Sequence, residues 1–376
     1  MREPYDAIVI GVGGMGSAAL YQLARRGKRV LGIDRFDIPN TMGSSHGVNR
    51  IIRLAYFEHP TYVPLLRRAY ELWRQVETEF DEQLLYITGS LDVGRPGSQV
   101  LDGSLQSCKA HGLAHEFLST EEVVARFPAY KLPEGFKAVW QPDGGFVLSE
   151  RAIVAHVTQA QAAGAEVRRN EAVVAWEVDG NGIVAVATDR GAYRAERLIL
   201  TAGAWAPDLI EELVGYAVPE RQALGWFEPL EPELFHIDRF PVFNFTVDEG
   251  HFYGLPVFGV PGFKLGRYHH LEEVVDPDTM DREPNERDER VLRDFIARYF
   301  PAANGPVADM KTCMFTNTED EHFVIDVHPE HPQVAIAAGF SGHGYKFASV
   351  VGEILADLAE RGTTGHDISR FAIGRF

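Results

Sequence analysis

The sequence predicts a mixed α/β fold in which a parallel-sheet domain, assembled from separate segments of the chain, carries an inserted β-rich domain. Three observations predict it. The chain opens with a short apolar strand, a glycine-rich turn and a helix, which is the order of a βαβ unit. Similar apolar strands return at residues 197–201 and 334–338. At 376 residues the chain is too long for one ordinary core, so two domains are expected.

The opening elements place glycines where a dinucleotide-binding turn needs them. An apolar run at residues 7–10 predicts a buried strand, the turn Gly11-x-Gly13-x-x-Gly16 follows, and a helix is expected over 17–26. Gly11 allows the tight turn, Gly13 lets the backbone approach a pyrophosphate, and Gly16 lets helix and strand pack closely. The helix N-terminus then presents free N–H groups to the phosphates.

Asp34 ends the next predicted strand, residues 29–33. Its carboxylate is placed to accept hydrogen bonds from an adenosine ribose and would repel a 2′-phosphate, which argues against NADP. The turn alone does not separate FAD from NAD. A second glycine-rich turn, residues 339–344, follows the strand at 334–338 and favours FAD, because a nicotinamide enzyme has less need for so late a return to the cofactor.

The remaining pattern assigns the rest of the chain to these two domains. Helices are predicted over 61–80, 149–163 and 345–361, with Ser149 as a cap, and strands at 166–167 and 173–178. Stretches rich in Pro and Phe include a hairpin signal, 243–247 followed by a turn at 248–250. A Rossmann-like FAD-binding domain is therefore expected over 1–83, 146–216 and 322–376, and an inserted β-rich substrate domain over 84–145 and 217–321.

Composition excludes several classes of partner. The formal charge of −18 argues against nucleic acid, because a phosphate backbone must be met by clustered Lys and Arg. No apolar run approaches the length that crosses a bilayer, and the first residues leave no room for a signal peptide, so a cytoplasmic location is expected. Only two cysteines occur, Cys108 and Cys313, which excludes a disulfide framework or a Cys-rich site, and no metal is expected.

Three further runs, in the right order, resemble the motifs of one family. The family is that of the monomeric sarcosine oxidases and N-methyltryptophan oxidases, which are FAD-dependent amine oxidoreductases of the DAO type. Its flavin-proximal motif resembles residues 43–53, its cysteine-containing motif resembles residues 311–326, and its C-terminal motif resembles residues 337–347. The resemblance implies a monomer that oxidises the secondary amine of an N-methyl amino acid. A hydride equivalent passes to the flavin, water hydrolyses the imine, and O₂ takes the electrons to give H₂O₂.

The same resemblance implies which residues contact the cofactor. Cys313 matches the cysteine that attaches FAD covalently through an 8α thioether, a reaction that needs a thiolate near a cation. A lone cysteine without that context is more often a small hydrophobe, as Cys108 is expected to be. The expected cofactor-binding residues are Gly11, Gly13, Gly14, Met15, Gly16, Asp34, Ser44, His46, Arg50, Val173, Gly203, Cys313, Gly342, His343, Gly344 and Lys346.

Four tasks at the active site are assigned in the same way. Arg53 and Lys346 match the pair that binds the substrate carboxylate, for which a planar guanidinium is well suited. Lys264 matches the lysine whose fixed charge supports O₂ reduction. A surface ion pair is the structural alternative for Arg53, and a solvent-directed side chain is the alternative for Lys264. Arg50 and His46 match residues beside the isoalloxazine ring, where Arg50 would favour anionic flavin.

Tyr253 and a histidine after Lys264 match residues that line the substrate amine. The family places this histidine four residues after the lysine, whereas here the run is one residue longer, so His269 is chosen and His270 is the fallback. A one-residue offset turns a side chain to the other face of a strand unless a bulge absorbs it. Asn49 also replaces the threonine usual before the flavin arginine.

The exact substrate stays open. The candidate walls of the pocket are Phe243, Phe245 and Tyr253. Sarcosine is the first-choice substrate, but nothing in the order of these residues distinguishes it from bulkier N-methyl amino acids such as N-methyltryptophan. A flavin dehydrogenase with a non-oxygen acceptor would not need Lys264. A non-catalytic FAD subunit would lack the carboxylate-binding cations, and an NAD-linked dehydrogenase would leave the context of Cys313 without meaning.

Overall fold

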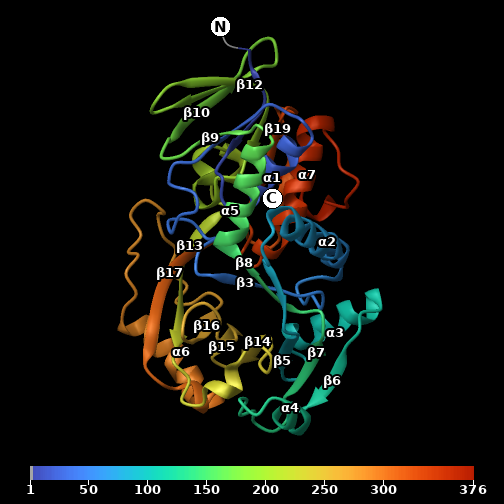
Figure 1. Cartoon of the computed structure of the whole chain (residues 1–376), viewed down its shortest axis with the longest axis vertical. Coiled ribbons are helices and arrows are strands. Elements are labelled where there is room, and N and C mark those ends of the chain that lie inside the picture. Colours follow the sequence, from blue (N-terminus) through green and yellow to red (C-terminus); the bar gives the residue numbers. More distant parts are fainter. Residues whose placement is uncertain (1–2) are drawn as a thin grey trace.

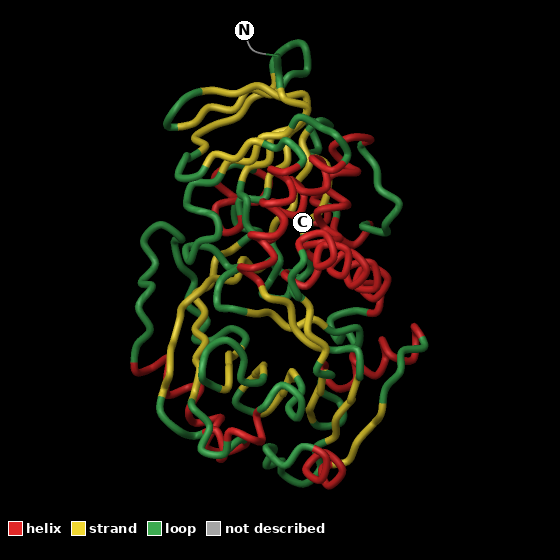
Figure 2. The backbone as a smooth tube through the Cα atoms, viewed as in Figure 1, coloured by secondary structure: helices red, strands yellow, loops and turns green. Residues whose placement is uncertain are grey.

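The computed structural model describes residues 3–376, and its strands form two large sheets and one small sheet (Figures 1 and 2). The first large sheet and its helices occupy the upper half of Figure 1, and the second large sheet occupies the lower half. The predicted mixed α/β fold is confirmed, because each large sheet carries helices of its own.

The first sheet has a parallel centre, as its apolar strands predict. From one side to the other this centre is made of β9 (Glu166–Arg168), β2 (Val30–Ile33), β1 (Tyr5–Ile10), β12 (Ala192–Leu200) and β19 (Val334–Ala338). Antiparallel strands extend it, namely β18 (Val324–Val327) beside β19, and β11 (Val184–Thr188) and β10 (Val173–Val178) beyond β12. The strands expected from the sequence in this domain are all present.

Four helices pack together beside this sheet and bury the largest apolar cluster. They are α1 (Gly14–Arg25), α2 (Val63–Phe80), α5 (Ser149–Ala162) and α7 (Ala348–Arg361). Helix α1 begins at Gly14, three residues earlier than predicted, because the glycine-rich turn leads directly into helical backbone. The prediction that Ser149 caps α5 is wrong: Ser149 is the first helical residue, and its hydroxyl donates to the Glu150 carboxylate instead.

The second sheet is built from the two segments that the sequence assigns to the inserted domain. Its order is β17 (Val307–Asn317), β13 (Val218–Phe227), β16 (Phe263–Arg267), β15 (Gly250–Leu255), β14 (Val242–Val247), β5 (Ser90–Gly94), β7 (Lys137–Gln141) and β6 (Glu116–Ser119). All neighbours are antiparallel except β14 and β5. The predicted hairpin is confirmed as β14 and β15.

Helices in the lower half were not predicted from the sequence. They are α3 (Gln99–His111), α4 (Thr120–Arg126) and α6 (Glu286–Tyr299). Helix α6 contributes Leu292, Phe295 and Ile296 to an aromatic-rich core on one face of the second sheet. Its start carries a capping box, since the Asn285 side chain accepts from the backbone N–H of Asp288 and the Asp288 carboxylate accepts from that of Asn285.

The small sheet joins segments from both halves of the molecule at mid-height in Figure 1. It pairs β8 (Gly145–Leu148) with β3 (Asn49–Ile52) on one side and with β4 (Leu85–Ile87) on the other. Strand β4 belongs to a segment assigned to the substrate domain, whereas β3 belongs to the FAD-binding segments. The domain boundaries drawn from the sequence therefore stay a prediction.

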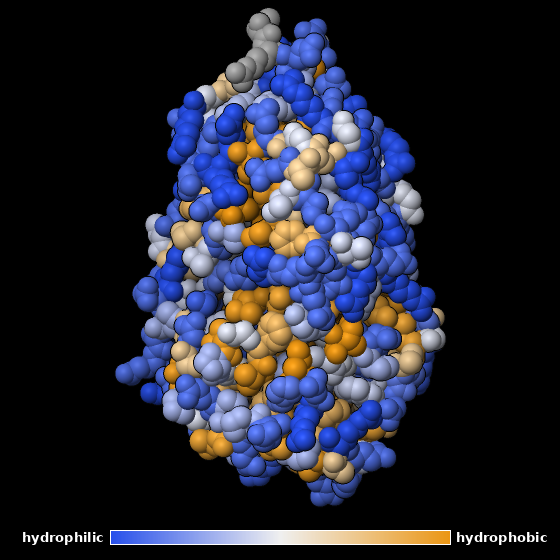
Figure 3. Space-filling view, viewed as in Figure 1, coloured by the Kyte–Doolittle hydropathy of each residue, from blue (hydrophilic) through white to orange (hydrophobic). Residues whose placement is uncertain are grey.

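The face shown in Figure 3 is mostly hydrophilic, and apolar side chains gather near its centre, over the upper part of the second sheet. Within residues 3–376, none of the helices has the length and apolar character that crossing a membrane requires.

Candidate functional site

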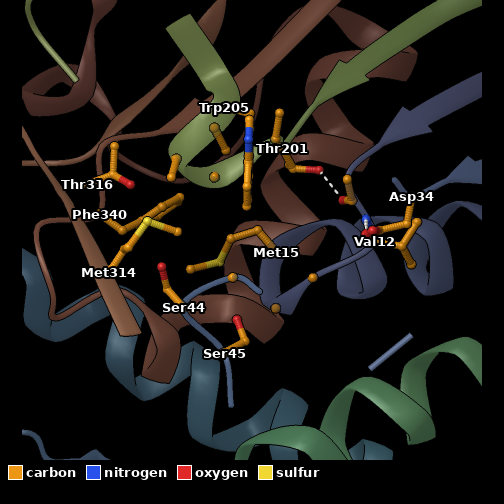
Figure 4. A pocket seen from close by; sticks show the side chains of 18 of the residues that line it. Val12, Met15, Asp34, Ser44, Ser45, Thr201, Trp205, Met314, Thr316 and Phe340 are labelled. Carbon is orange, nitrogen blue, oxygen red and sulfur yellow. Dashed lines mark hydrogen bonds between the residues drawn. The ribbon is translucent and has the colours of Figure 1, made fainter. Parts of the chain in front are cut away.

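A cavity opens at the carboxyl ends of the parallel strands of the first sheet. Its lining comes from residues 10–15 after β1, 33–36 after β2, 201–205 after β12, 339–342 after β19, and 314–316 of β17. Figure 4 shows Asp34 and Val12 at one end, Met15 in the middle, and Met314, Thr316 and Phe340 at the other. Ligands of open parallel sheets bind at this edge, because the loops that follow the strands meet there.

Two glycines of the first turn, Gly11 and Gly16, lie at positions that have no room for a side chain. Gly11 has φ +83°, and a Cβ there would lie 2.5 Å from the carbonyl oxygen of Thr201. A Cβ on Gly16 would lie 1.8 Å from the carbonyl oxygen of Gly11, so α1 and β1 approach too closely for any larger residue. A Cβ on Gly13 would meet open space. The turn therefore exposes its backbone to the cavity at Gly13 and packs tightly on either side.

Asp34 is held at the end of β2 by backbone donors. Its carboxylate oxygens accept hydrogen bonds from the N–H groups of Val12 and Phe36, each at 2.8 Å. Burial raises the pKa of this carboxyl, and the two N–H groups oppose that rise. The side chain is thus fixed at the cavity edge with lone pairs left to accept further hydrogen bonds.

Most residues expected to contact the cofactor line this cavity. They are Gly11, Gly13, Gly14, Met15, Asp34, Ser44, Arg50, Val173, Gly203, Gly342 and Gly344. Gly16, His46, Cys313, His343 and Lys346 lie outside that lining, in neighbouring positions described below.

Thr201 and Trp205, both lining residues, were missed by the sequence analysis. The Thr201 hydroxyl donates to the carbonyls of Ile10 and Gly11, which fixes the turn. The signal was present, because both residues directly follow an apolar strand, where polar and functional side chains of parallel sheets gather.

One face of the second sheet collects several of the predicted catalytic residues. Residues directly opposite each other in an antiparallel ladder point to the same side. Cys313 lies opposite Gln222 on β13, Lys264 lies opposite Trp226 on β13, and Tyr253 lies opposite Gly266 on β16. The alternation of side chains along β13 and β16 places all of them on one face. The other face is the one buried against α6.

The prediction that Phe243 and Phe245 line the pocket is wrong. Asn244, between them, lies opposite Tyr253, so the two phenylalanines point the other way. Both are fully buried in the core that includes α6.

Lys264 is buried, and its ammonium group is fully engaged. Nζ donates to the carbonyls of Gly47 and Asn49, each at 2.7 Å, and to the Asn49 side chain at 3.0 Å. Burial lowers the pKa of Lys264 well below its ordinary value, and the nearby Arg50 lowers it further. The alternative of a solvent-directed lysine is therefore excluded.

Arg50 and His46 lie beside Lys264 on the segment that precedes and begins β3. Arg50 donates to the Ser44 carbonyl at 2.9 Å and lines the cavity. His46 is buried, and neither of its ring nitrogens has a hydrogen-bond partner among residues 3–376. Burial and, after it, the charge of Arg50 lower the pKa of His46 to about 4, so the ring is neutral. A buried neutral imidazole without partners leaves a donor and an acceptor free for a ligand.

Cys313 is a free, buried thiol that packs with Leu224 and Trp226. Burial raises its pKa, while the charges of Arg50 and Lys264 lower it. Its neighbours on β17, Met314 and Phe315, line the cavity. Cys108 is also free and buried, but it lies on α3 and faces the apolar core, where burial raises its pKa to about 12.

Arg53 and Lys346 meet over one aromatic ring. The Arg53 guanidinium lies 4.5 Å from the centre of the Tyr56 ring, and Lys346 Nζ lies 5.4 Å from it. Arg53 is 1% exposed and donates to the Glu58 carboxylate, so it is not a surface ion pair. Lys346 Nζ donates to the His343 carbonyl at 2.6 Å, and burial lowers the pKa of this lysine to about 7, with Arg53 as the next cause.

His269 and His270 both lie next to carboxylates. The His269 ring bonds the Glu220 carboxylate through Nδ1 at 2.9 Å and that of Glu321 through Nε2 at 3.1 Å. Hydrogen bonds that the ring donates to these two carboxylates raise the pKa of His269 to about 10. His270 is fully buried, with Nε2 3.2 Å from the carboxylate of Asp288. Strand β16 ends at Arg267, so the one-residue offset falls in a turn in which His269 has φ +51°.

These residues fit an FAD molecule. The open backbone at Gly13, the fixed carboxylate of Asp34 and the unpartnered nitrogens of His46 provide sites for a pyrophosphate, a ribose and a polar ring. They lie along a single cavity and its immediate border.

Comparison with known proteins identifies the family. A model of the family described as FAD dependent oxidoreductase matches residues 6–358. The chain is 43% identical to a monomeric sarcosine oxidase of Bacillus sp. (strain B-0618), over 100% of this chain and 97% of that protein. It is 33% identical to an N-methyl-L-tryptophan oxidase of Citrobacter koseri, over 99% of each.

Solved structures agree with this assignment. The structure of NikD, an amino acid oxidase essential for nikkomycin biosynthesis, superimposes with a TM-score of 0.85 at 27% identity, covering 99% of this chain and 98% of that one. The chain belongs to the FAD-dependent oxidoreductase family and is an FAD-dependent oxidoreductase.

Proposed function

We propose that the protein oxidises the secondary amine of N-methyl amino acids, with sarcosine as the lead substrate. The N-methyl amino acid, water and O₂ would give the demethylated amino acid, formaldehyde and H₂O₂. The observation that carries the proposal is the pair of buried cations, Arg53 and Lys346, over the Tyr56 ring. Such a pair suits one small carboxylate. The names of the relatives, which include sarcosine oxidases at 41–43% identity, support it.

The residues around the cavity would divide the work. FAD, when bound, accepts the hydride equivalent and passes two electrons on to O₂. Arg53 and Lys346 bind the substrate carboxylate and so orient the N-methyl group. Arg50 holds positive charge where the reaction develops negative charge. The three oxygen acceptors around Lys264 Nζ favour its charged ammonium form against the effect of burial, so that it adds a second positive charge. Tyr253 lies on the same sheet face and forms part of the pocket wall.

We further propose that FAD is attached covalently through the sulfur of Cys313. Arg50 and Lys264 favour the thiolate of this cysteine. Acid precipitation tests the attachment: yellow colour should remain with the wild-type precipitate and be released from Cys313→Ser. Cys108→Ser is the matched control and should retain colour. Colour freely released from the wild type would refute the covalent link, while FAD binding would stand.

Peroxide and formaldehyde assays with purified protein test the main proposal. Sarcosine should give both products in equal amounts, and N-methyltryptophan measures the tolerance for bulk that a relative at 33% identity suggests. Flavin reduction by sarcosine without peroxide would favour a dehydrogenase that uses another acceptor. No reduction by any N-methyl amino acid would refute the proposal. A monomeric state and a cytoplasmic location stay predictions from the sequence.

A further inference from the structure

A histidine that the motifs do not mark lies on the substrate side of the second sheet. His251 is in β15, opposite Thr246 and two residues before Tyr253, so it shares the sheet face of Tyr253 and Lys264. Phe252, between the two, points into the core against α6. His251 thus faces the first domain, where it meets Phe57, whereas the histidines after Lys264 lie beyond the end of β16.

Aromatic contacts hold the His251 ring in one orientation. It stacks on Tyr268 with ring centres 4.5 Å apart and planes 1° apart. The Phe57 ring meets it edge-on at 5.3 Å. The backbone adds a further restraint, because the Tyr268 N–H donates to the His251 carbonyl at 2.8 Å. A ring packed in this way can present its nitrogens at a fixed position.

His251 lies between the carboxylate-binding cations and the cavity. Phe57 contacts the His251 ring, and the Arg53 guanidinium lies 4.2 Å from the centre of the Phe57 ring. On the other side Tyr268 lies 5.4 Å from Phe315, a residue that lines the cavity. An amino acid whose carboxylate rests on Arg53 would extend past this ring on its way to the cavity.

The ring nitrogens of His251 have no hydrogen-bond partner in the part of the chain that the structure describes. No side-chain hydrogen bond of His251 occurs within residues 3–376, and Nε2 is buried without a partner. Burial lowers the pKa of His251 to about 3, and the nearby Glu58 opposes that effect, so the ring is neutral. A neutral imidazole offers one donor and one acceptor. Leaving a buried polar atom unpaired costs free energy, and a bound ligand would recover it.

We propose that His251, rather than His269 or His270, is the imidazole that positions the substrate amine, by accepting a hydrogen bond from its N–H group. This rests on the proposed function. His269 instead ties the turn after β16 to β13 and to the loop at residue 321 through its two carboxylate partners. The acceptor is uncharged, so it holds the amine without adding charge beside the cavity. The expected ligands are amines with a carboxylate one carbon away.

Two phenylalanine variants separate the roles of the two histidines. His251→Phe keeps the ring and its stacking on Tyr268 but removes the nitrogens, and it should raise KM for sarcosine about fivefold to tenfold, the worth of one hydrogen bond. Acetate has the carboxylate without the amine, so its dissociation constant, read from the flavin absorption, should stay within twofold of wild type. His269→Phe should leave KM for sarcosine within twofold.

His251→Gln, which keeps a hydrogen-bonding group, should recover part of the affinity and guards against a variant that simply misfolds. Equal loss of acetate and sarcosine binding in His251→Phe would overturn the inference, because it would indicate a general packing defect. So would an unchanged KM in His251→Phe or a larger effect from His269→Phe. A wild-type protein that neither binds nor oxidises sarcosine would instead refute the proposed function, and this inference with it.

Discussion

Arg53 and Glu58 form a buried ion pair in which one guanidinium nitrogen donates to both carboxylate oxygens at 2.9 Å. Their side chains are 2% and 9% exposed. A substrate carboxylate that binds Arg53 must therefore compete with a carboxylate that the protein already supplies. Asp92, also buried and close to Arg53, adds a second acidic group, although burial raises its pKa.

Replacing Glu58 by Gln should consequently tighten the binding of carboxylates. The dissociation constant of acetate should fall about tenfold, since the competing charge is gone. The unliganded variant should lose about 3 kcal/mol of unfolding free energy, because Arg53 is left buried without its counter-ion, and acetate should restore part of it. Flavin absorption and thermal unfolding measure the two effects. Glu71→Gln, at an exposed pair with Arg68, is the control and should change neither. Weaker acetate binding in Glu58→Gln would contradict competition.

Lys346 should make carboxylate binding depend on pH near neutrality. Burial lowers the pKa of this lysine to about 7, so it is charged below pH 7 and loses its proton as the pH rises through that value. Acetate affinity should therefore fall above pH 7, by up to about tenfold per pH unit until the pKa of the complex is passed. Acetate is the probe because it carries no amine that titrates in this range.

Lys346→Arg stays charged and should give a flat profile between pH 6 and pH 9. Lys346→Met should bind acetate weakly at every pH in that range. A sloping profile in Lys346→Met would assign the titration to another group.

Removal of the Lys264 charge should slow the oxygen reaction far more than the oxidation of substrate. Lys264→Met loses three hydrogen bonds to the Gly47–Asn49 segment and the positive charge beside Arg50. Loss of a preorganised electrostatic contact of this kind costs about a hundredfold in rate or more. Stopped-flow mixing of reduced protein with O₂ should detect that loss. Anaerobic reduction by sarcosine should change only a few-fold, and equal slowing of both steps would contradict the assignment.

The elements that sequence predicts best here are those whose signal is local. The strand, turn and helix at the N-terminus follow from glycines whose absent side chains are sterically required, as Gly11 and Gly16 are. The hairpin of β14 and β15 follows from alternation and a two-residue turn. Helix α6 was not predicted, because the Pro and Phe content of its segment indicates β structure. Asn285 and Asp288, which form its capping box, were the local signal for a helix start.

The substrate side depends on contacts between distant segments, which no local pattern reveals. Arg53 and Glu58 are close in sequence and pair with each other. Lys346, however, belongs to the C-terminal segment and reaches the Tyr56 ring beside this pair only through the tertiary fold. The position of His251 is set by the register of β15 with its neighbours. His269 is the choice that the resemblance to the family motif implies, but β16 ends at Arg267, so His269 lies outside the ladder.

The segment of the second domain around Asp278 contacts residues that line the cavity. Its carboxylate accepts from Trp205 Nε1 at 2.8 Å and pairs with Arg35 at 2.8 Å, and both partners line the cavity. Met280 packs on Ala204 and Met314 in the same place. We therefore expect this segment to help retain FAD.

The effect should be visible only when the cofactor is not covalently attached, so the test uses Cys313→Ser as background. Adding Asp278→Ala should raise the FAD dissociation constant about fivefold, because one exposed ion pair and one hydrogen bond are lost. Equilibrium dialysis or flavin fluorescence measures it. Thr279→Ala, at the exposed neighbouring position, is the control and should leave the constant unchanged. Equal FAD affinity in the Asp278 and Thr279 variants would mean that the segment does not contribute to retention of the cofactor.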